Sequence, residues 1–297
     1  SYKFFVLDSP VVNAFALPGG YIYVSRGLLA LANSEAELAA VLGHEAGHIT
    51  GRHSAERYSR GVVTSLGASI LSAAIDKSGV SQALGIGSDL YLKSYSRSQE
   101  NEADTLGIRY LARNGYDPQA MTSFLTHLQG SSSLESQIDG RNSSGFSYFS
   151  THPATSERVA KTAGEVAAAP KGGDTARDKY LAMINGITYG ESEKHGFVRG
   201  QSFIHPGIGF KFSAPDGFKM ANQPAQVIAM SDQGAVMIFD MAPNKNSQDP
   251  LSYLTKSWMQ GEPVSAPESI TINGMRAAKA GFPGTINNVP MTIRLIV

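Results

Sequence analysis

The 297-residue sequence contains no cysteine, and it has no excess of charge of either sign. Without cysteine there is no disulfide framework, and any zinc ligand must be a histidine or a carboxylate side chain. The 25 Lys and Arg residues balance the 25 Asp and Glu residues. No overall electric field therefore favours binding to nucleic acid or to an anionic membrane.

Long apolar runs and an N-terminal secretory signal are also missing. No run approaches the roughly 20 apolar residues that a membrane-spanning helix needs. The chain opens on YKFFVLD, which has the pattern of a strand that has already begun, so we expect a further segment upstream. The length suits two ordinary domains, each large enough to bury a core without disulfides.

The stretch Ser34 to His53, SEAELAAVLGHEAGHITGRH, combines helix signals with side chains that bind metals. Ser34 followed by Glu37 predicts a capping box at the start of a helix. Glu45 falls within a stripe of apolar residues at helical spacing, which is expected to face a core. The apolar members of the stripe are Leu38, Val41, Leu42 and Ile49. A carboxylate buried there is costly unless a nearby group uses its charge or its proton.

His44 and His48 lie four residues apart, so a helix places both imidazoles beside Glu45, where they can bind one cation. The sequence HEAGH is an instance of H-E-x-x-H, in which the glutamate is the expected general base. The alternative is a chance match on an ordinary amphipathic helix, and the capping signal and the inward-facing Glu45 argue against it. Small residues on the opposite face predict that another backbone approaches closely: Ala36, Ala40, Gly43 and Gly47.

A zinc site in an enzyme usually has three protein ligands and one open position, so this motif needs one more ligand. Within the helical pattern that follows Ser94, Glu100 and Asp104 share the apolar face, whereas Glu102 lies opposite and is expected to be a solvated surface charge. We assign Glu100 as the third ligand and Asp104 as a carboxylate that orients a ligating histidine. The alternative is that Glu100 and Asp104 pair with Arg97 or other cations in a structural network.

A hairpin precedes the metal motif. The runs Asn13–Leu17 and Tyr21–Ser25 flank the turn residues Pro18, Gly19 and Gly20, which predicts two paired strands. If the run Asn13–Leu17 is an edge strand, it can bind an extended peptide as an added strand. A strand paired on both sides is equally compatible with the pattern alone, although the position just before a metal helix favours peptide binding.

Two further stretches carry weaker signals. The run from Gly61 to Ile75 is apolar but laced with Ser and Gly, which is typical of a buried helix or a lid rather than a membrane span. The segment from Gly130 to Gly145 is rich in Ser, Gly and Asn and predicts a surface loop.

Three motifs in this order resemble one family: NAFALPGGYIYVSRGLL, HEAGH and SRSQENEADTLG. The chain from Tyr2 to about Thr162 resembles the M48 metallopeptidases, the Ste24/HtpX/Oma1-like gluzincins, and in particular their soluble bacterial periplasmic branch. The resemblance implies a zincin-type α+β domain with one zinc ion on His44, His48 and Glu100, and with Glu45 as the base. It also implies proteolysis in the cell envelope, often with an upstream signal peptide or lipid anchor.

The resemblance extends to STHPATSERVAKT, where His152 precedes a proline and an arginine follows the proline by five residues. His152 is expected either to stabilise the oxyanion of a tetrahedral intermediate or to bind zinc as a fourth ligand that excludes water. Without the resemblance, a helix-start or core position would be the better interpretation of a single histidine. The remaining histidines have no comparable partners and are expected to be structural: His53, His127, His195 and His205.

From about Phe197 onward the pattern changes to strands with one helical segment near Pro250 to Gln260. It predicts an antiparallel sheet with a helix on one face, in an order weakly similar to PsbP/Mog1-like modules. The expected architecture is therefore α+β. A mainly helical zincin-like peptidase domain with a small edge-strand hairpin would occupy residues 1–195, and an α+β module residues 196–297.

The function that these features predict is a zinc-dependent endopeptidase that acts on misfolded or envelope proteins. Glu45 would accept the proton of the attacking water, and polypeptides would be the partners. The alternative is a zinc-containing chaperone or scaffold that binds unfolded envelope proteins with little or gated proteolysis. A hydrolase for a non-peptide amide is a third interpretation. The substrate and the cleavage preference do not follow from the sequence.

Overall fold

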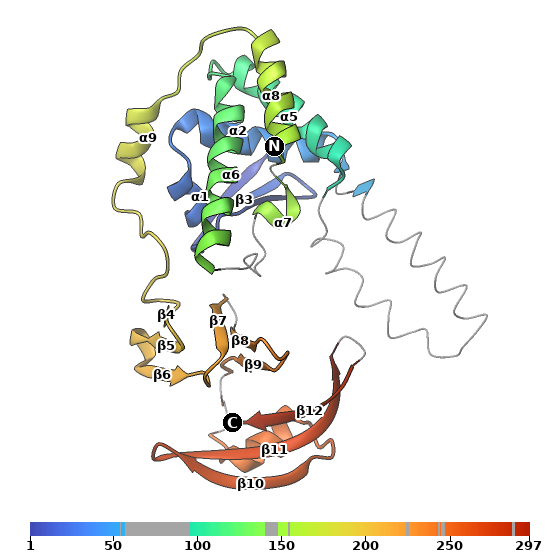
Figure 1. Cartoon of the computed structure of the whole chain (residues 1–297), viewed down its shortest axis with the longest axis vertical. Coiled ribbons are helices and arrows are strands. Elements are labelled where there is room, and N and C mark those ends of the chain that lie inside the picture. The colour runs from blue at the N-terminus through green and yellow to red at the C-terminus, as the bar shows by residue number, and fades with distance from the viewer. Residues whose placement is uncertain are drawn as a thin grey trace, which may run out of the picture. The chain divides into compact units, whose positions relative to one another are not determined.

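The structure, a computed structural model, describes residues 1–53, 55–56, 95–139, 148–153, 155–223, 226–242, 244, 247–286 and 289–297. The described residues have a mixed α+β architecture (Figure 1). They divide into two compact units, Ser1–Met237 and Ile238–Val297. Among the helices described, none has the length and apolar character needed to cross a membrane. The expected helix between residues 61 and 75 lies outside the described residues.

A small sheet opens the first unit. It contains β1 (Lys3–Leu7), β2 (Ala14–Leu17) and β3 (Tyr21–Ser25) in the order β1-β3-β2. The predicted hairpin is confirmed, since β2 pairs antiparallel with β3 and the turn glycines Gly19 and Gly20 have φ values of 94° and 88°. In the described part of the chain β2 therefore lies at a sheet edge. Its inward side chains Ala14 and Ala16 are buried, and α2 packs against β2 and β3.

The helix α1 (Arg26–Leu31) follows the sheet directly, and α2 (Glu35–Thr50) is the predicted metal helix. The Ser34 hydroxyl accepts a hydrogen bond from the Glu37 amide, which confirms Ser34 as the N-cap. The reciprocal bond of a capping box is absent at Ser34, because the Glu37 carboxylate accepts instead from the amide of Asn33. Glu37 is buried, and its other oxygen accepts from the Ser123 hydroxyl of α6. Glu37 thus joins two helices in addition to capping one.

The helix α5 (Arg97–Arg113) packs along the small-residue face of α2. A Cβ added at Gly47 would lie 3.0 Å from the Cα of Ala103, and one added at Gly43 would lie 3.2 Å from the Cα of Gly107. The two backbones are therefore close enough that only glycine fits at these positions of α2 without a shift. This confirms that α2 is buried on more than one side.

Three more helices cover this pair: α6 (Gln119–Asp139), the short α7 (Tyr148–Thr151) and α8 (Ser156–Ala168). The predicted loop from Gly130 is wrong up to Asp139, because α6 continues through it. Within α6 the Ser133 hydroxyl donates to the carbonyl of Gln129, so a polar residue is accommodated inside the helix. The core between these helices includes Val41, Ile108, Leu111, Met121, Phe124, Leu125 and Tyr148. A further helix, α9 (Arg177–Ile184), ends the helical part.

The strands that follow form separate three-stranded sheets, so the expectation of one antiparallel sheet is wrong. The first comprises β4 (Phe197–Arg199), β5 (Ser202–His205) and β6 (Phe210–Ser213), with the 3-10 turn η1 (Pro206–Ile208) between β5 and β6. The second comprises β7 (Phe218–Asn222), β8 (Val227–Ser231) and β9 (Val236–Phe239). These strands are only three to five residues long. Among the described residues, each of these strands pairs only with its neighbours in sequence.

The third sheet belongs to the C-terminal unit and is antiparallel throughout. It contains β10 (Ser265–Ile272), β11 (Met275–Ile286) and β12 (Val289–Ile296). The predicted helical segment is present as α10 (Pro250–Ser252) and the π-helical η2 (Tyr253–Trp258). Leu254 of η2 is fully buried against Ala278 and Ala280 of β11. This small contact forms the core of the unit.

The close approach of α2 and α5 leads to a stability prediction. The Gly47→Ala variant gains about 1 kcal/mol of helix propensity but overpacks the α5 backbone at a cost of about 1–3 kcal/mol. Its free energy of unfolding should therefore not rise, and should fall by up to about 2 kcal/mol. The control is Gly164→Ala in α8, where an added Cβ meets nothing within 4 Å. It should stabilise the protein by about 0.5–1 kcal/mol, and urea unfolding measures both. Equal stabilisation by both variants would contradict the close contact.

Candidate metal centre

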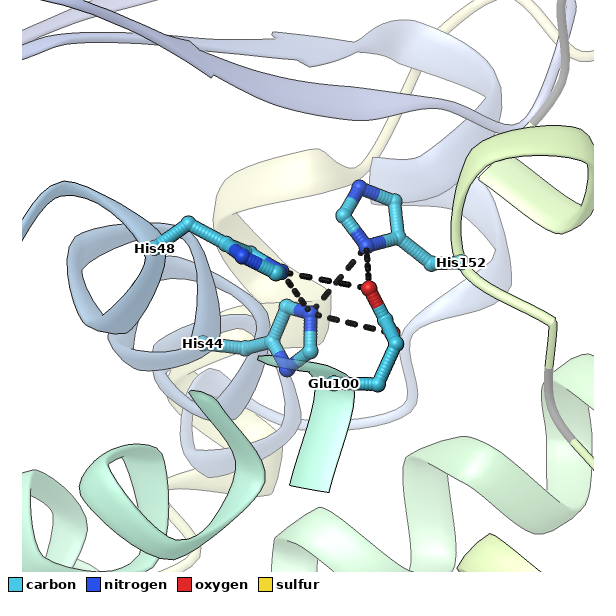
Figure 2. A group of neighbouring side chains, drawn as sticks. All are labelled: His44, His48, Glu100 and His152. Atoms are coloured by element: carbon cyan, nitrogen blue, oxygen red, sulfur yellow. Dashed lines mark hydrogen bonds and ion pairs between the residues drawn. The ribbon is translucent and has the colours of Figure 1, made fainter. Parts of the chain in front are cut away.

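Four side chains from three parts of the chain converge on one point (Figure 2). His44 and His48 come from α2, Glu100 from the first turn of α5, and His152 from the residue after α7. Each offers one ligand atom, and these atoms lie within 4.8 Å of one another. All four side chains are buried, with exposed fractions of 2% or less. The four donors thus form a closed group away from bulk water.

The distances between the donor atoms are short. The Nε2 atoms of His44 and His48 are 2.9 Å apart, and His48 Nε2 lies 3.3 Å from Oε1 of Glu100. His152 directs its Nδ1 into the same group, 2.9 Å from Glu100 Oε1 and 3.2 Å from His44 Nε2. Imidazole nitrogens and a carboxylate oxygen are the donors that zinc accepts in proteins without cysteine. The donor set therefore fits a single zinc ion.

Glu45 lies beside this group and supports the same conclusion. Its side chain is 0% exposed, and among the described residues neither carboxylate oxygen has a hydrogen-bond partner. Nε2 of His152 lies 3.6 Å from its Oε1. A buried carboxylate without a partner is unfavourable unless a cation or a polar ligand lies close to it. The position of Glu45 fits a carboxylate that acts on a water or substrate next to a metal.

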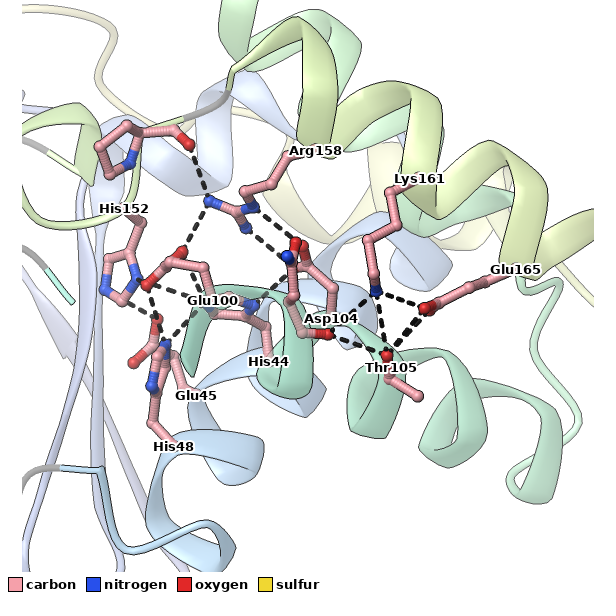
Figure 3. A network of polar contacts seen from close by, with 12 residues as sticks. His44, Glu45, His48, Glu100, Asp104, Thr105, His152, Arg158, Lys161 and Glu165 are labelled. Atoms are coloured by element: carbon pink, nitrogen blue, oxygen red, sulfur yellow. Dashed lines mark hydrogen bonds and ion pairs between the residues drawn. The ribbon is translucent and has the colours of Figure 1, made fainter. Parts of the chain in front are cut away.

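Asp104 and Arg158 hold the ligands from behind (Figure 3). Nδ1 of His44 lies 2.8 Å from Asp104 Oδ1, which leaves Nε2 of His44 directed at the donor group. The Arg158 guanidinium donates to both oxygens of Asp104 at 2.8 Å and pairs with Glu100 Oε2 at 2.6 Å. Its Nη1 also donates to the carbonyl of Pro153, next to His152. One buried arginine therefore links α8 to α5 and to the His152 segment.

The outcome for the predicted structural network is mixed. Arg97 pairs with Glu157 on the surface and not with Glu100. Glu100 and Asp104 nevertheless do pair with a cation, which is Arg158. Because both carboxylates also face histidines of α2, this pairing supports the donor group and does not replace it. The sequence had marked Arg158 only through its spacing from the proline, without a role.

These contacts shift the ionisation of the buried groups. Burial alone would lower the pKa of His44, but the carboxylates of Asp104 and Glu100 outweigh burial and raise it. Burial would raise the pKa of Asp104, yet His44 and Arg158 lower it to about 2. Burial also opposes ionisation of Glu100, but His152 and His48 hold its pKa well below the usual range. Both carboxylates are therefore anionic at neutral pH.

His48 is held differently from His44. Burial lowers the pKa of His48 well below its usual value, so its ring is neutral at neutral pH. Its Nδ1 lies 2.8 Å from Nδ1 of His53, and the Tyr95 ring stacks on its face at a centroid distance of 3.8 Å. His53 was expected to have no such partner, and that expectation is wrong. Nε2 of His53 in turn lies 3.4 Å from Oε2 of Glu102, whose side chain is 60% exposed as expected.

His152 is fixed by the residues on either side of it. Its amide donates to the carbonyl of Tyr148 at 2.7 Å, and the Tyr148 ring stacks on its imidazole at 4.5 Å. The Tyr148 amide donates to the carbonyl of Val12, just before β2, at 2.9 Å. This bond attaches α7 to the edge strand. Sequence reasoning did not identify Tyr95 or Tyr148, because their ring contacts depend on how distant segments pack.

Comparison with known proteins gives one family. The model of peptidase family M48 matches residues 1–166. The chain is 40% identical to the putative beta-barrel assembly-enhancing protease of Vibrio cholerae over 136 residues. This aligned stretch covers 43% of this chain and 28% of the relative. It is 36% identical to the mitochondrial metalloendopeptidase OMA1 of Arabidopsis thaliana over 159 residues. That aligned stretch covers 53% of this chain and 30% of the relative.

A third relative is the beta-barrel assembly-enhancing protease of Escherichia coli (strain K12), 35% identical over 136 residues. That stretch is 43% of this chain and 28% of the relative. The matched stretches thus span less than a third of the length of these three proteins.

The buried contacts of Asp104 predict a pH-dependent stability. Because the pKa of Asp104 is lowered from 3.8 to about 2, its ionised form stabilises the fold above about pH 4, and this contribution is lost as the pH falls toward 2. In metal-free protein Asp104→Asn should cost about 3 kcal/mol at neutral pH, because Arg158 loses a buried partner.

The difference in unfolding free energy between Asp104→Asn and the parent should narrow when urea unfolding is repeated at decreasing pH. Asp178→Asn serves as the control, since Asp178 is an exposed carboxylate of α9 in the same unit. A difference for Asp104→Asn that stays constant down to about pH 2 would contradict the assigned ion pair.

Proposed function

The chain belongs to peptidase family M48, and on this premise we propose that it is a zinc-dependent endopeptidase that hydrolyses peptide bonds with water. The observation that carries the proposal is the buried group of three histidines and Glu100, beside Glu45, whose oxygens have no hydrogen-bond partner among the described residues. In this proposal the domain is zincin-like, and it extends over residues 1–195, with residues 196–297 as a separate module. The compact units themselves divide after Met237.

His44, His48 and Glu100 would hold one zinc ion. The two imidazoles already direct Nε2 toward the carboxylate of Glu100. When bound, zinc would supply a Lewis acid that polarises the substrate carbonyl and the attacking water. Asp104 holds Nδ1 of His44, so that the ring presents Nε2 in a fixed orientation.

Glu45 is the proposed general base. Its carboxylate is buried next to the donor group and accepts no hydrogen bond from another described residue. Both oxygens therefore remain available for proton transfer. It would accept a proton from the attacking water and then pass it to the leaving amine. Burial in a site that excludes bulk water strengthens each of these polar interactions.

His152 is proposed to act on the same reaction. Its Nδ1 lies among the other donor atoms, which is compatible with a fourth ligand that excludes water. Its Nε2 points toward Glu45, which is compatible with a donor to the oxyanion of a tetrahedral intermediate. His44, His48 and Glu100 make up a three-ligand set without it, so we propose that the main contribution of His152 is to catalysis.

Polypeptides are the proposed substrates, bound as an added strand along β2. Two observations support this position: β2 lies at an edge of the described sheet, and its start is joined through Val12 to the segment that carries His152. An extended peptide at this edge would receive backbone hydrogen bonds independently of its sequence. Misfolded or envelope proteins are the substrates that we propose.

The proposed location is the bacterial cell envelope. It is supported by two bacterial relatives named for beta-barrel assembly and by the motif resemblance. An upstream lipid anchor is part of the same proposal.

The test of the peptidase proposal is Glu45→Gln. Glutamine keeps the size of the side chain but cannot accept the proton, so cleavage of casein should fall by about 100- to 10,000-fold while zinc content stays at one per chain. His44→Ala should lose both zinc and activity. Casein cleavage and metal content, measured on the same samples, separate these results. Glu157→Gln is the control, since Glu157 is an exposed residue of α8 that pairs with Arg97 on the surface.

A Glu45→Gln variant that cuts casein at the parental rate would overturn the assignment of the base. Binding of unfolded protein without cleavage by the zinc-loaded parent would instead favour the chaperone or scaffold function.

A second variant examines His152. His152→Asn should lower kcat by about 100-fold, the usual cost of losing an oxyanion donor, with zinc content unchanged because three ligands remain. Loss of zinc comparable to that of His44→Ala would show that His152 is a permanent ligand. A variant faster than the parent would show that His152 blocks the site.

A further inference from the structure

The two histidines of α2 have outer contacts of different chemistry. Nδ1 of His44 faces Asp104, a buried anion that Arg158 holds. Nδ1 of His48 faces another imidazole, that of His53, which no motif explains. His53 is 2% exposed and lies five residues after His48, just beyond the end of α2. The position and burial of His53 therefore require an account of their own.

The protons of this contact can be assigned from geometry. His48 directs Nε2 toward His44 and Glu100, so the nitrogen that binds a metal must be Nε2 without a proton. Its proton then lies on Nδ1 and is donated to Nδ1 of His53 at 2.8 Å. His53 consequently carries its own proton on Nε2, which faces the carboxylate of Glu102. The opposite arrangement would put the His48 proton on Nε2 and prevent metal binding.

The backbone after α2 is shaped for this contact. Arg52 has φ of 57°, in the left-handed region that non-glycine residues rarely adopt, and this turn brings His53 back toward His48. A Cβ added at Gly51 would lie 2.5 Å from Nε2 of His53, so the imidazole lies directly over the glycine. A strained residue and a glycine in adjacent positions together place one side chain.

We propose that His53 is a positioning residue for the metal centre: it accepts the Nδ1 proton of His48, and Glu102 fixes the tautomer that allows this. The Tyr95 ring on the face of His48 prevents the imidazole from tilting out of this contact. The inference rests on the proposed metal site, but it does not depend on which bond the enzyme cleaves. A partner that fixes the tautomer and orientation of a ligating histidine raises metal affinity.

The test compares His53→Asn with His53→Leu. The two new side chains have nearly the same shape, and both remove the ring, but only asparagine has an oxygen where Nδ1 of His53 lay. His53→Leu should weaken zinc binding by about 10- to 100-fold, whereas His53→Asn should stay within a few-fold of the parent. Zinc affinity is measured by competition with a chelator, and unfolding of the metal-free proteins is measured in parallel.

His127→Leu is the matched control. His127 contacts Asn33 and Glu37 rather than a metal ligand, so its loss should leave zinc affinity unchanged. Equal zinc affinity of His53→Asn and His53→Leu, whether both are weakened or both are parental, would overturn the inference. A merely structural role of the ring would weaken both variants alike.

The outcome of this test is separate from that of the peptidase proposal. A parent chain that binds zinc but does not cleave casein refutes the peptidase function, and the Asn and Leu affinities still decide the role of His53. Conversely, cleavage by the parent with indistinguishable His53 variants refutes only the positioning role.

Discussion

The metal centre depends on the close approach of two helix backbones. His44 and His48 lie on α2 and Glu100 lies on α5, and a single ion requires their donor atoms to meet within a few ångströms. Helices with ordinary side chains at their interface lie 8–10 Å apart. Gly43 and Gly47 of α2 face the backbone of α5, and an added Cβ at either would lie only 3.0–3.2 Å from a Cα atom of α5. The helix propensity lost at each glycine is the cost of bringing ligands from two helices together.

The second constraint is charge. Three carboxylates are buried in or behind the centre, Glu45, Glu100 and Asp104, and Arg158 is the buried arginine that pairs with two of them. A divalent cation among the donors would offset the rest, which explains why so many acidic groups can be buried together. Arg158 also ties α8 and the His152 segment to α5, so the same charge balance fixes the position of both.

Helical periodicity predicts which side chains of α2 and α5 face the candidate site, but it does not predict the residues that contact those side chains from other parts of the chain. Periodicity on single helices placed Glu45 with the two histidines, and Glu100 with Asp104 on one face. The outer contacts of Arg158, Tyr95 and Tyr148 join residues far apart in the chain, and no local pattern reports such contacts. His53 is an intermediate case. It is near His48 in sequence, but the left-handed turn at Arg52 that brings the two together has no signature in a non-glycine residue.

The sequence alone determined the start of α2, the hairpin before it and the side chains that α2 and α5 turn inward. Each of these follows from short-range rules of capping, turn chemistry and helical spacing. It did not determine that α6 continues to Asp139, or that the C-terminal strands divide into separate sheets, because packing and strand length override residue preferences there. The motif resemblance had already pointed to His152, whereas only the tertiary structure decided that Arg158 and His53 contact the centre. The distance between elements depends on the fit of many side chains, and periodicity within one element carries no information about it.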